Sequence, residues 1–218
     1  MATVNAQTVQ GSRTAPAAPA TNPGSGIRNH SAGIPFIRQT PNNEGNFMDI
    51  VDCILADHDR QRRMFAALDQ ARGDNDTLGK IFNRLRNFLE AHAEAEELYF
   101  YPRLLQLGEG ALDSDSAEET TDDAIDDHNK IAEAAEAAKK EKVGSDAWWK
   151  CVDKTNLQNS KHMSEEERQG LTDFRRKVPL EERVQLGLKY LAFESHHSGE
   201  YEREEKDPEE YIEKNEAA

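Results

Sequence analysis

The sequence has few cysteines, and their positions exclude two common ways of stabilising a small fold. Cys53 and Cys151 are the only two among 218 residues, and neither stands in a CxxC pair. Two thiols without this spacing are too few for a disulfide framework, and they do not match a cysteine-rich zinc site. We therefore expect two reduced thiols within helices.

Long apolar stretches and positive charge are also scarce. No segment approaches the roughly 20 apolar residues of a membrane-spanning helix. A net charge of −15 and a pI near 4.9 argue against nucleic-acid binding, which requires Lys and Arg facing the phosphates. The same charge does not suit an anionic membrane. Because the N-terminus, MATVNAQTVQ, also lacks the basic and apolar regions of a signal peptide, we expect a cytoplasmic protein.

Composition divides the chain into three parts. Residues 1–46 are rich in Ala, Pro, Thr, Asn, Gly and Ser, so burial of apolar groups cannot offset the entropy lost on ordering them. Residues 47–198 carry helical periodicity with few interruptions. Residues 199–218 are charged and acidic. We predict a disordered N-terminal tail, one helical domain and an acidic C-terminal tail, and a protein partner could bind through the tails.

The periodic region is predicted to form four long helices and one short one. The first two are expected at 47–72 and 76–107, and Pro102 should kink the second or end its regular part. The third follows a loop at 108–121 with a capping serine at 114 or 116, and it ends near 143. The fourth begins at a cap at 145 or 146, and the short fifth helix spans about 179–197. The fold class is therefore all-α, an antiparallel up-and-down four-helix bundle with an additional short C-terminal helix.

The two halves of this region repeat one pattern of metal-ligating residue types. An isolated histidine is followed 34 positions later by a His-x-x-x-Glu pair, and the pattern recurs 70 positions along the chain. The halves are therefore predicted to be equivalent helix hairpins. The residues concerned are His58, His92 and Glu96 in the first half and His128, His162 and Glu166 in the second.

An up-and-down bundle brings these six side chains to one level. In each half the two histidines stand at similar distances before and after the turn, and a helix rises about 1.5 Å per residue. Six ligands are too many for one metal with an open position but suit two, with Glu96 and Glu166 bridging. Mixed imidazole and carboxylate donors favour first-row ions such as iron. As ordinary core residues, unpaired imidazoles and carboxylates would be costly to bury.

Tyr99 is the candidate catalytic residue, because it follows Glu96 by three positions on the same stripe of the helix. It either packs in the core or places a phenol near the metals as a hydrogen-bond donor or ligand. Its counterpart in the second half is Gln169. The acidic neighbours are expected to face water (Asp57 and Asp127) or to be solvated or support the ligands from outside (Glu97, Glu165 and Glu167).

The ordered set of four histidines and two glutamates resembles the hemerythrin-like HHE cation-binding domains, over about residues 47–175. The resemblance implies an antiparallel four-helix bundle that holds two iron ions with an oxo or hydroxo bridge and both glutamates as bridging ligands. Oxygen-carrying hemerythrins have a further histidine where this chain has Ala132, and an aspartate where it has Glu166. These departures favour a more open centre and disfavour reversible oxygen carriage, so the chain is more similar to the bacterial type.

Two functions are compatible with this centre. The first is a redox-active di-iron protein, an oxidoreductase that reacts with hydrogen peroxide, oxygen or nitric oxide. The most specific version of this hypothesis is a catalase-like or peroxidase-like activity. The second is a non-catalytic sensor or iron-binding module, in which metal occupancy orders the bundle and changes a surface offered to a partner. A ferritin-like oxidase or store matches less well, because those centres use Glu-x-x-His pairs and more carboxylates.

Overall fold

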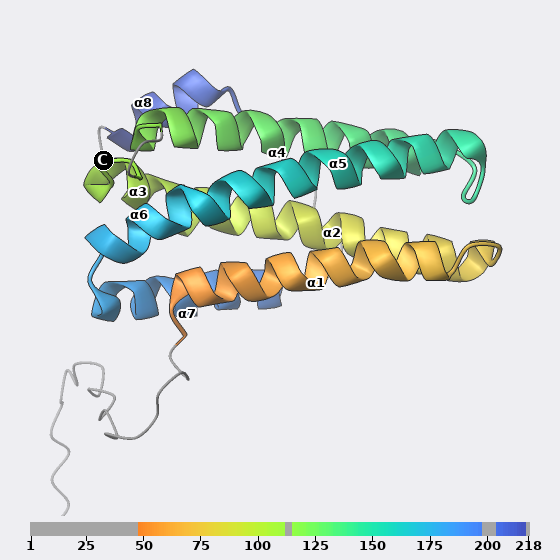
Figure 1. Cartoon of the computed structure of the whole chain (residues 1–218), viewed down its shortest axis with the longest axis horizontal. Helices are drawn as coiled ribbons and strands as arrows, with labels where there is room; N and C mark the ends of the chain where they lie inside the picture. The colour runs from red at the N-terminus through yellow and green to blue at the C-terminus, as the bar shows by residue number, and fades with distance from the viewer. Residues whose placement is uncertain (1–47, 112–114, 198–203, 217–218) are drawn as a thin grey trace, which may run out of the picture. The chain divides into compact units, whose positions relative to one another are not determined.

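The computed structural model describes residues 48–111, 115–197 and 204–216, and within these ranges its regular structure consists of helices alone. The prediction of an all-α fold is confirmed. Figure 1 shows two antiparallel hairpins packed side by side, α1 with α2 and α4 with α5. The four long helices are α1 (Ile50–Gln70), α2 (Asn75–Tyr99), α4 (Ala117–Lys139) and α5 (Asp146–Arg168).

Side-chain caps fix where the long helices begin. Asp49 accepts a hydrogen bond from a backbone N–H of the first turn of α1 at 3.0 Å. Ser116 and Glu119 form a capping box at the start of α4, and Ser145 caps α5. The turn before α5 contains Gly144 at φ +78°, a conformation that favours glycine. The predicted caps at 116 and 145 are therefore confirmed, whereas the third predicted helix ends at Lys139, earlier than expected.

Both hairpins contain a break shortly after the glutamate of the His-x-x-x-Glu pair. Phe100 separates α2 from α3 (Tyr101–Leu107), and Gln169 separates α5 from α6 (Gly170–Lys177). The interruption predicted near Pro102 is confirmed, because this proline lies in the first turn of α3, where its missing N–H is tolerated. The equivalent break that creates α6 was not predicted.

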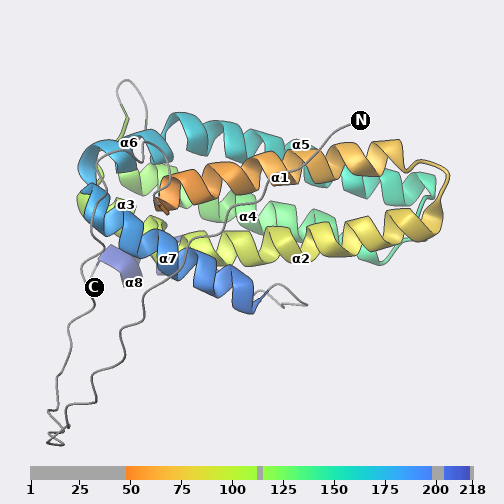
Figure 2. The same ribbon diagram turned by 90° about the horizontal axis from the view of Figure 1, so that it is seen from below.

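Two further helices come from the C-terminal part of the chain. The predicted fifth helix is α7 (Leu180–His196), which packs against α1 and α2 (Figure 2). Part of the predicted acidic tail forms α8 (Pro208–Glu216), which packs against α3 and α4 because Tyr211 and Ile212 supply apolar area to bury. The predicted disordered tail at 1–46 lies outside the described residues.

Two hydrophobic clusters fill the bundle and leave a polar layer between them. Phe82, Leu85 and Trp148 belong to the cluster near the hairpin turns, whereas Phe100 and Phe174 belong to the cluster at the opposite end. This arrangement keeps the polar layer inside the bundle. As expected, Cys53 and Cys151 are free thiols. Among the described residues, no helix is both long and apolar enough to cross a membrane.

Candidate metal centre

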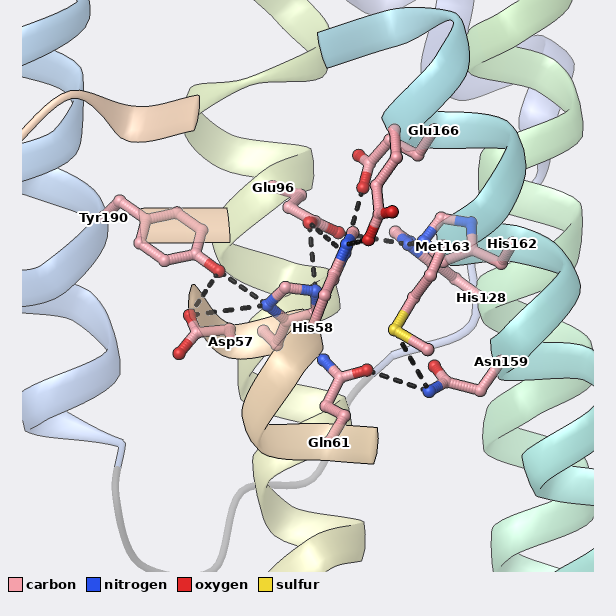
Figure 3. Close-up of polar contacts among 12 residues, drawn as sticks. Asp57, His58, Gln61, Glu96, His128, Asn159, His162, Met163, Glu166 and Tyr190 are labelled. Carbon is pink, nitrogen blue, oxygen red and sulfur yellow. Dashed lines mark hydrogen bonds and ion pairs between the residues drawn. The ribbon is translucent and has the colours of Figure 1, made fainter. Parts of the chain in front are cut away.

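The six residues predicted as metal ligands all lie in the polar layer. One or two come from each of the four long helices, and none is more than 3% exposed. Figure 3 shows the labelled members pointing into a common interior from separate helices. The bundle therefore brings together the complete set of His58, His92, Glu96, His128, His162 and Glu166.

The histidines form two groups that share Glu96. In one group, Glu96 Oε1 lies 3.0 Å from His92 Nε2 and 3.9 Å from His58 Nε2. In the other group, Glu96 Oε2 lies 3.3 Å from His128 Nε2, which is 3.1 Å from His162 Nε2. Within each group the potential ligand atoms lie within 4.8 Å of one another. Glu96 thus directs one oxygen to each group, as a bridging carboxylate would.

Glu166 faces the same interior but is held less symmetrically. Its Oε2 atom lies 3.2 Å from His58 Nε2, whereas its Oε1 atom accepts a hydrogen bond of 2.7 Å from the Tyr101 hydroxyl. A carboxylate offers about four lone-pair positions, so the bond to Tyr101 leaves Glu166 able to accept further partners. Glu166 is therefore the second carboxylate available between the two groups.

Five buried atoms of this set have no partner with hydrogen-bond geometry in the part of the chain that the structure describes. Burying an imidazole nitrogen or a carboxylate oxygen without a partner costs free energy, and native proteins rarely leave such atoms unpaired. Cations placed between the two groups would satisfy all of them at once, so the residues present fit a pair of metal ions. The atoms are His58 Nε2, His92 Nε2, both carboxylate oxygens of Glu96, and Glu166 Oε2.

Two further glutamates hold the isolated histidines from outside. Glu97 Oε1 lies 2.9 Å from His128 Nδ1, and Glu167 Oε1 lies 2.9 Å from His58 Nδ1. The glutamate of each hairpin therefore reaches the isolated histidine of the other hairpin. A carboxylate on Nδ1 orients the ring and leaves Nε2 free to bind a metal. Of the glutamates next to the pairs, Glu97 and Glu167 thus support the site, whereas Glu165 pairs with a lysine.

Comparison with known protein families gives one assignment. Residues 49–172, more than half of the chain, match the hemerythrin HHE cation-binding domain. The chain belongs to this family. Comparisons with curated proteins and with solved structures give no match. The matched region contains all six converging residues and ends within α6, so α7 and α8 lie beyond the hemerythrin domain.

One support of the hemerythrin site comes from α7. The Tyr190 hydroxyl lies 2.6 Å from His92 Nδ1 and donates to Asp57 Oδ2 at 3.0 Å. Figure 3 shows the Tyr190 hydroxyl directed at the Asp57 carboxylate. We had expected Asp57 to face water, but its carboxylate turns toward the site. The sequence pattern did not reveal Tyr190, because α7 carries no histidine or glutamate repeat.

Asp127 also departs from the expectation that it faces water. Its side chain is buried, and its two oxygens accept hydrogen bonds from Lys161 at 3.0 Å and from Lys130 at 3.3 Å. Lys161 precedes the ligand candidate His162 on the neighbouring helix. The prediction was wrong because a cation from another helix is available to pair with the buried carboxylate.

Tyr99 takes the first of the two positions that the sequence left open, because it packs against the core and not near the ligand candidates. Its ring packs edge-on against Phe193 of α7, at 6.2 Å between centroids. Helix α2 is regular through Tyr99, which is its last residue. The break at Phe100 turns the next residue, Tyr101, inward, and this fully buried tyrosine donates a hydrogen bond to the ligand candidate Glu166.

The charges inside the hemerythrin domain are mutually paired. Burial disfavours the charged forms, but the proximity of Glu96 and Asp57 outweighs burial and raises the pKa of His92 well above its usual value. The neighbouring histidines in turn lower the pKa of Glu96 well below its usual value despite burial. Burial and the adjacent His128 lower the pKa of His162 well below normal. A metal therefore competes with protons less at His162 than at His92.

Proposed function

We propose that this hemerythrin domain is a di-iron oxidoreductase that reacts with hydrogen peroxide, oxygen or nitric oxide. Catalase-like decomposition of hydrogen peroxide is the most concrete form of the proposal. The observation that carries it is the set of five buried ligand atoms that form no hydrogen bond among the described residues, in an interior that holds four imidazoles and two carboxylates. Such a donor set suits iron better than a structural zinc ion.

Each iron ion would take one pair of histidines. His58 and His92 would hold one ion, His128 and His162 the other, and the two glutamates would lie between them. Bound iron would supply one-electron changes of oxidation state and exchangeable coordination positions for a small molecule. Glu97 and Glu167 keep two imidazole rings oriented through Nδ1, and burial between two apolar clusters excludes bulk water.

The environment of Ala132 supports an open centre. This residue lies one turn after His128 on α4, and it lines a small cavity together with His92, His128 and His162. A histidine at position 132 would fill the space beside these three ligand candidates, whereas the alanine leaves it open. A small molecule could occupy this space without displacing a protein ligand.

The proposal is tested on protein reconstituted with ferrous iron under anaerobic conditions. We expect two iron ions per chain by mass spectrometry, oxygen evolution from hydrogen peroxide at an electrode, and an absorption change on adding nitric oxide. His162→Ala should abolish these responses, whereas His196→Ala, at an exposed position of α7, should not. If the iron-loaded protein neither evolves oxygen nor changes its absorption with peroxide or nitric oxide, the proposal is wrong.

A non-catalytic sensor is the second candidate, and one chain of contacts favours it. Lys206, in the segment before α8, binds Glu97 at 2.6 Å, and Glu97 binds His128. Metal occupancy at His128 is thereby connected to a C-terminal segment outside the hemerythrin match. Iron binding without peroxide chemistry, together with faster proteolysis near Lys206 after chelation, would favour this function.

A further inference from the structure

A small cavity lies against the proposed metal ligands on one side of the bundle. It has a volume of about 20 Å³ and is enclosed by residues of α2, α4 and α5, including His92, His128 and His162. A cavity needs roughly 10–15 Å³ to hold one water molecule. The space therefore accepts a water molecule or a molecule of similar size, and excludes organic substrates.

A larger hollow lies outside this cavity along the seam between α2 and α4. Its volume is about 330 Å³, and Glu205 of the C-terminal segment lines one part of it. The inner cavity and the outer hollow share three lining residues, Arg86, Glu90 and Ala132. These three side chains therefore form the wall between the surface and the metal centre.

The wall is polar and incompletely bonded. Arg86 Nη1 donates to Glu90 Oε1 at 2.8 Å, and both side chains are at least nine-tenths buried. Arg86 Nε and Glu90 Oε2 have no hydrogen-bond partner among the described residues. Leaving buried charged groups partly unpaired is costly, so a small polar molecule that entered the seam would gain hydrogen bonds from them.

The wall is also weakly fixed across the seam. Arg86 and Glu90 lie one turn apart on α2, and the contact of Arg86 with α4 is a longer one, 3.9 Å to Glu136 Oε2. On the α4 side, Ala132 presents only a methyl group. A rotation of the Arg86 side chain toward Glu136 would open the wall without moving either helix.

The outer hollow has an acidic rim. Glu133, Glu136 and Glu205 line it, and Lys139 is the one lysine among its lining residues. Negative charge around an opening lowers the local concentration of small anions and leaves uncharged molecules unaffected. The rim therefore selects by charge, whereas the inner cavity selects by size.

We propose that small uncharged molecules reach the metal centre through the seam between α2 and α4, with the Arg86–Glu90 pair as a gate beside Ala132. Hydrogen peroxide, nitric oxide and oxygen fit this class, whereas superoxide, azide and other small anions are disfavoured at the rim. The inference rests on the proposed function, because the route serves the metal ligands assigned there.

Two variants test the route by opposite effects. The rate of nitric oxide binding to the ferrous protein is measured by stopped-flow absorption, which requires no turnover. Ala132→Leu should slow binding at least about tenfold by filling the seam, whereas Arg86→Gln should accelerate it at least about threefold by shortening the gate. Ala137→Leu is the matched control for the first, because this half-buried alanine of α4 lines neither space. Iron content and absorption before mixing must match the unmodified protein.

A third space identifies the competing route. It has a volume of about 10 Å³, lies beside Glu166, and is lined in part by Gln169 and Asp123. If Gln169→Phe slows nitric oxide binding and Ala132→Leu does not, access runs along the other side of α4 and the proposal is wrong. Equal slowing in Ala132→Leu and Ala137→Leu would also overturn it.

The charge selection is tested with azide and nitric oxide as a matched pair of probes. Replacing the two rim residues Glu133 and Glu205 by glutamine should accelerate azide binding to the ferric protein at least about threefold and leave nitric oxide binding unchanged, because neither contacts the Arg86–Glu90 pair. The control double variant Glu118→Gln with Asp122→Asn changes the net charge equally, on α4 but away from the hollow. Equal acceleration of azide binding in the two double variants would show that the rim does not select by charge. If these patterns hold while peroxide is not decomposed, the proposed reaction fails and the route stands.

Discussion

The two hairpins supply the same ligand pattern but support it differently. In the first hairpin, Asp57 lies beside Tyr190 from α7, whereas its counterpart Asp127 lies between Lys130 and Lys161. The repeat thus determines which residues converge. Segments outside the repeat determine the charge that surrounds them, so the two halves of the centre are chemically unequal.

The inequality is largest at the paired histidines. Both are buried, which lowers the pKa of each, but Glu96 and Asp57 act on His92 and raise its pKa well above normal. His162 lies beside His128, and its pKa is well below normal. The pKa values of the two paired histidines are therefore shifted in opposite directions, although the sequence around them is repeated.

The largest difference should appear between the two glutamates. Glu96 belongs to both groups of potential ligand atoms, whereas Glu166 belongs to neither and already accepts a hydrogen bond from Tyr101. We expect Glu96→Gln to lose both iron ions and Glu166→Gln to retain at least one. Iron per chain after gel filtration, measured by mass spectrometry, checks this. Circular dichroism controls for folding, and equal loss in the two folded variants would show that the glutamates are equivalent.

A smaller difference is expected between the cations that hold the outer glutamates. Lys206 pairs with the fully buried Glu97 side chain at 2.6 Å, whereas Arg62 pairs with the partly exposed Glu167 at 2.7 Å. Water replaces an exposed cation more readily than a buried one. Lys206→Met should therefore weaken iron binding roughly tenfold, within the range known for outer partners of metal ligands, and Arg62→Met should weaken it less than about threefold.

Competition with a calibrated chelator measures both iron affinities. Lys214→Met, at an exposed position of α8, is the control for removing a lysine from the C-terminal segment, and Lys206→Arg should restore most of the affinity. If Arg62→Met weakens iron binding more than Lys206→Met does, the Lys206–Glu97 pair is not the stronger support of the site.

The repeated pattern was sufficient to predict the bundle and the convergence of six side chains, because helical spacing determines which faces meet. Their role as metal ligands stays a prediction. Contacts made by single side chains could not be predicted in this way. Tyr101 required knowledge of the helix break at Phe100, and Tyr190 and Lys206 come from segments with no periodicity that relates them to the site. Asp127 was misjudged because its lysine partner lies on another helix.

The smallest expected effect concerns the acidic surroundings of Asp57. Burial, and then the charge of Asp57, raise the pKa of Glu194 on α7 from 4.5 to about 8. Between these values the folded protein holds a proton that the unfolded chain releases, so this group makes the free energy of unfolding fall as pH rises from about 5 to 8. Glu194→Gln removes this pH dependence. Near pH 5 the free energy of unfolding of the variant should match that of the unmodified protein.

Near pH 8 the Glu194→Gln variant should be more stable by about 1 kcal/mol, a value reduced from the full shift because the side chain is partly exposed. Urea unfolding of the metal-free proteins at pH 5, 6.5 and 8 measures the difference. Histidines that do not act on Glu194 contribute equally to both proteins and cancel in the comparison, whereas His92 interacts with Glu194 and forms part of the measured difference. Glu181→Gln, at an exposed position of the same helix, should show no such pH-dependent gain. An equal gain in the free energy of unfolding at all three pH values would mean that Glu194 is ionised throughout this range. The surroundings of Asp57 and Asp127 would then differ only in packing.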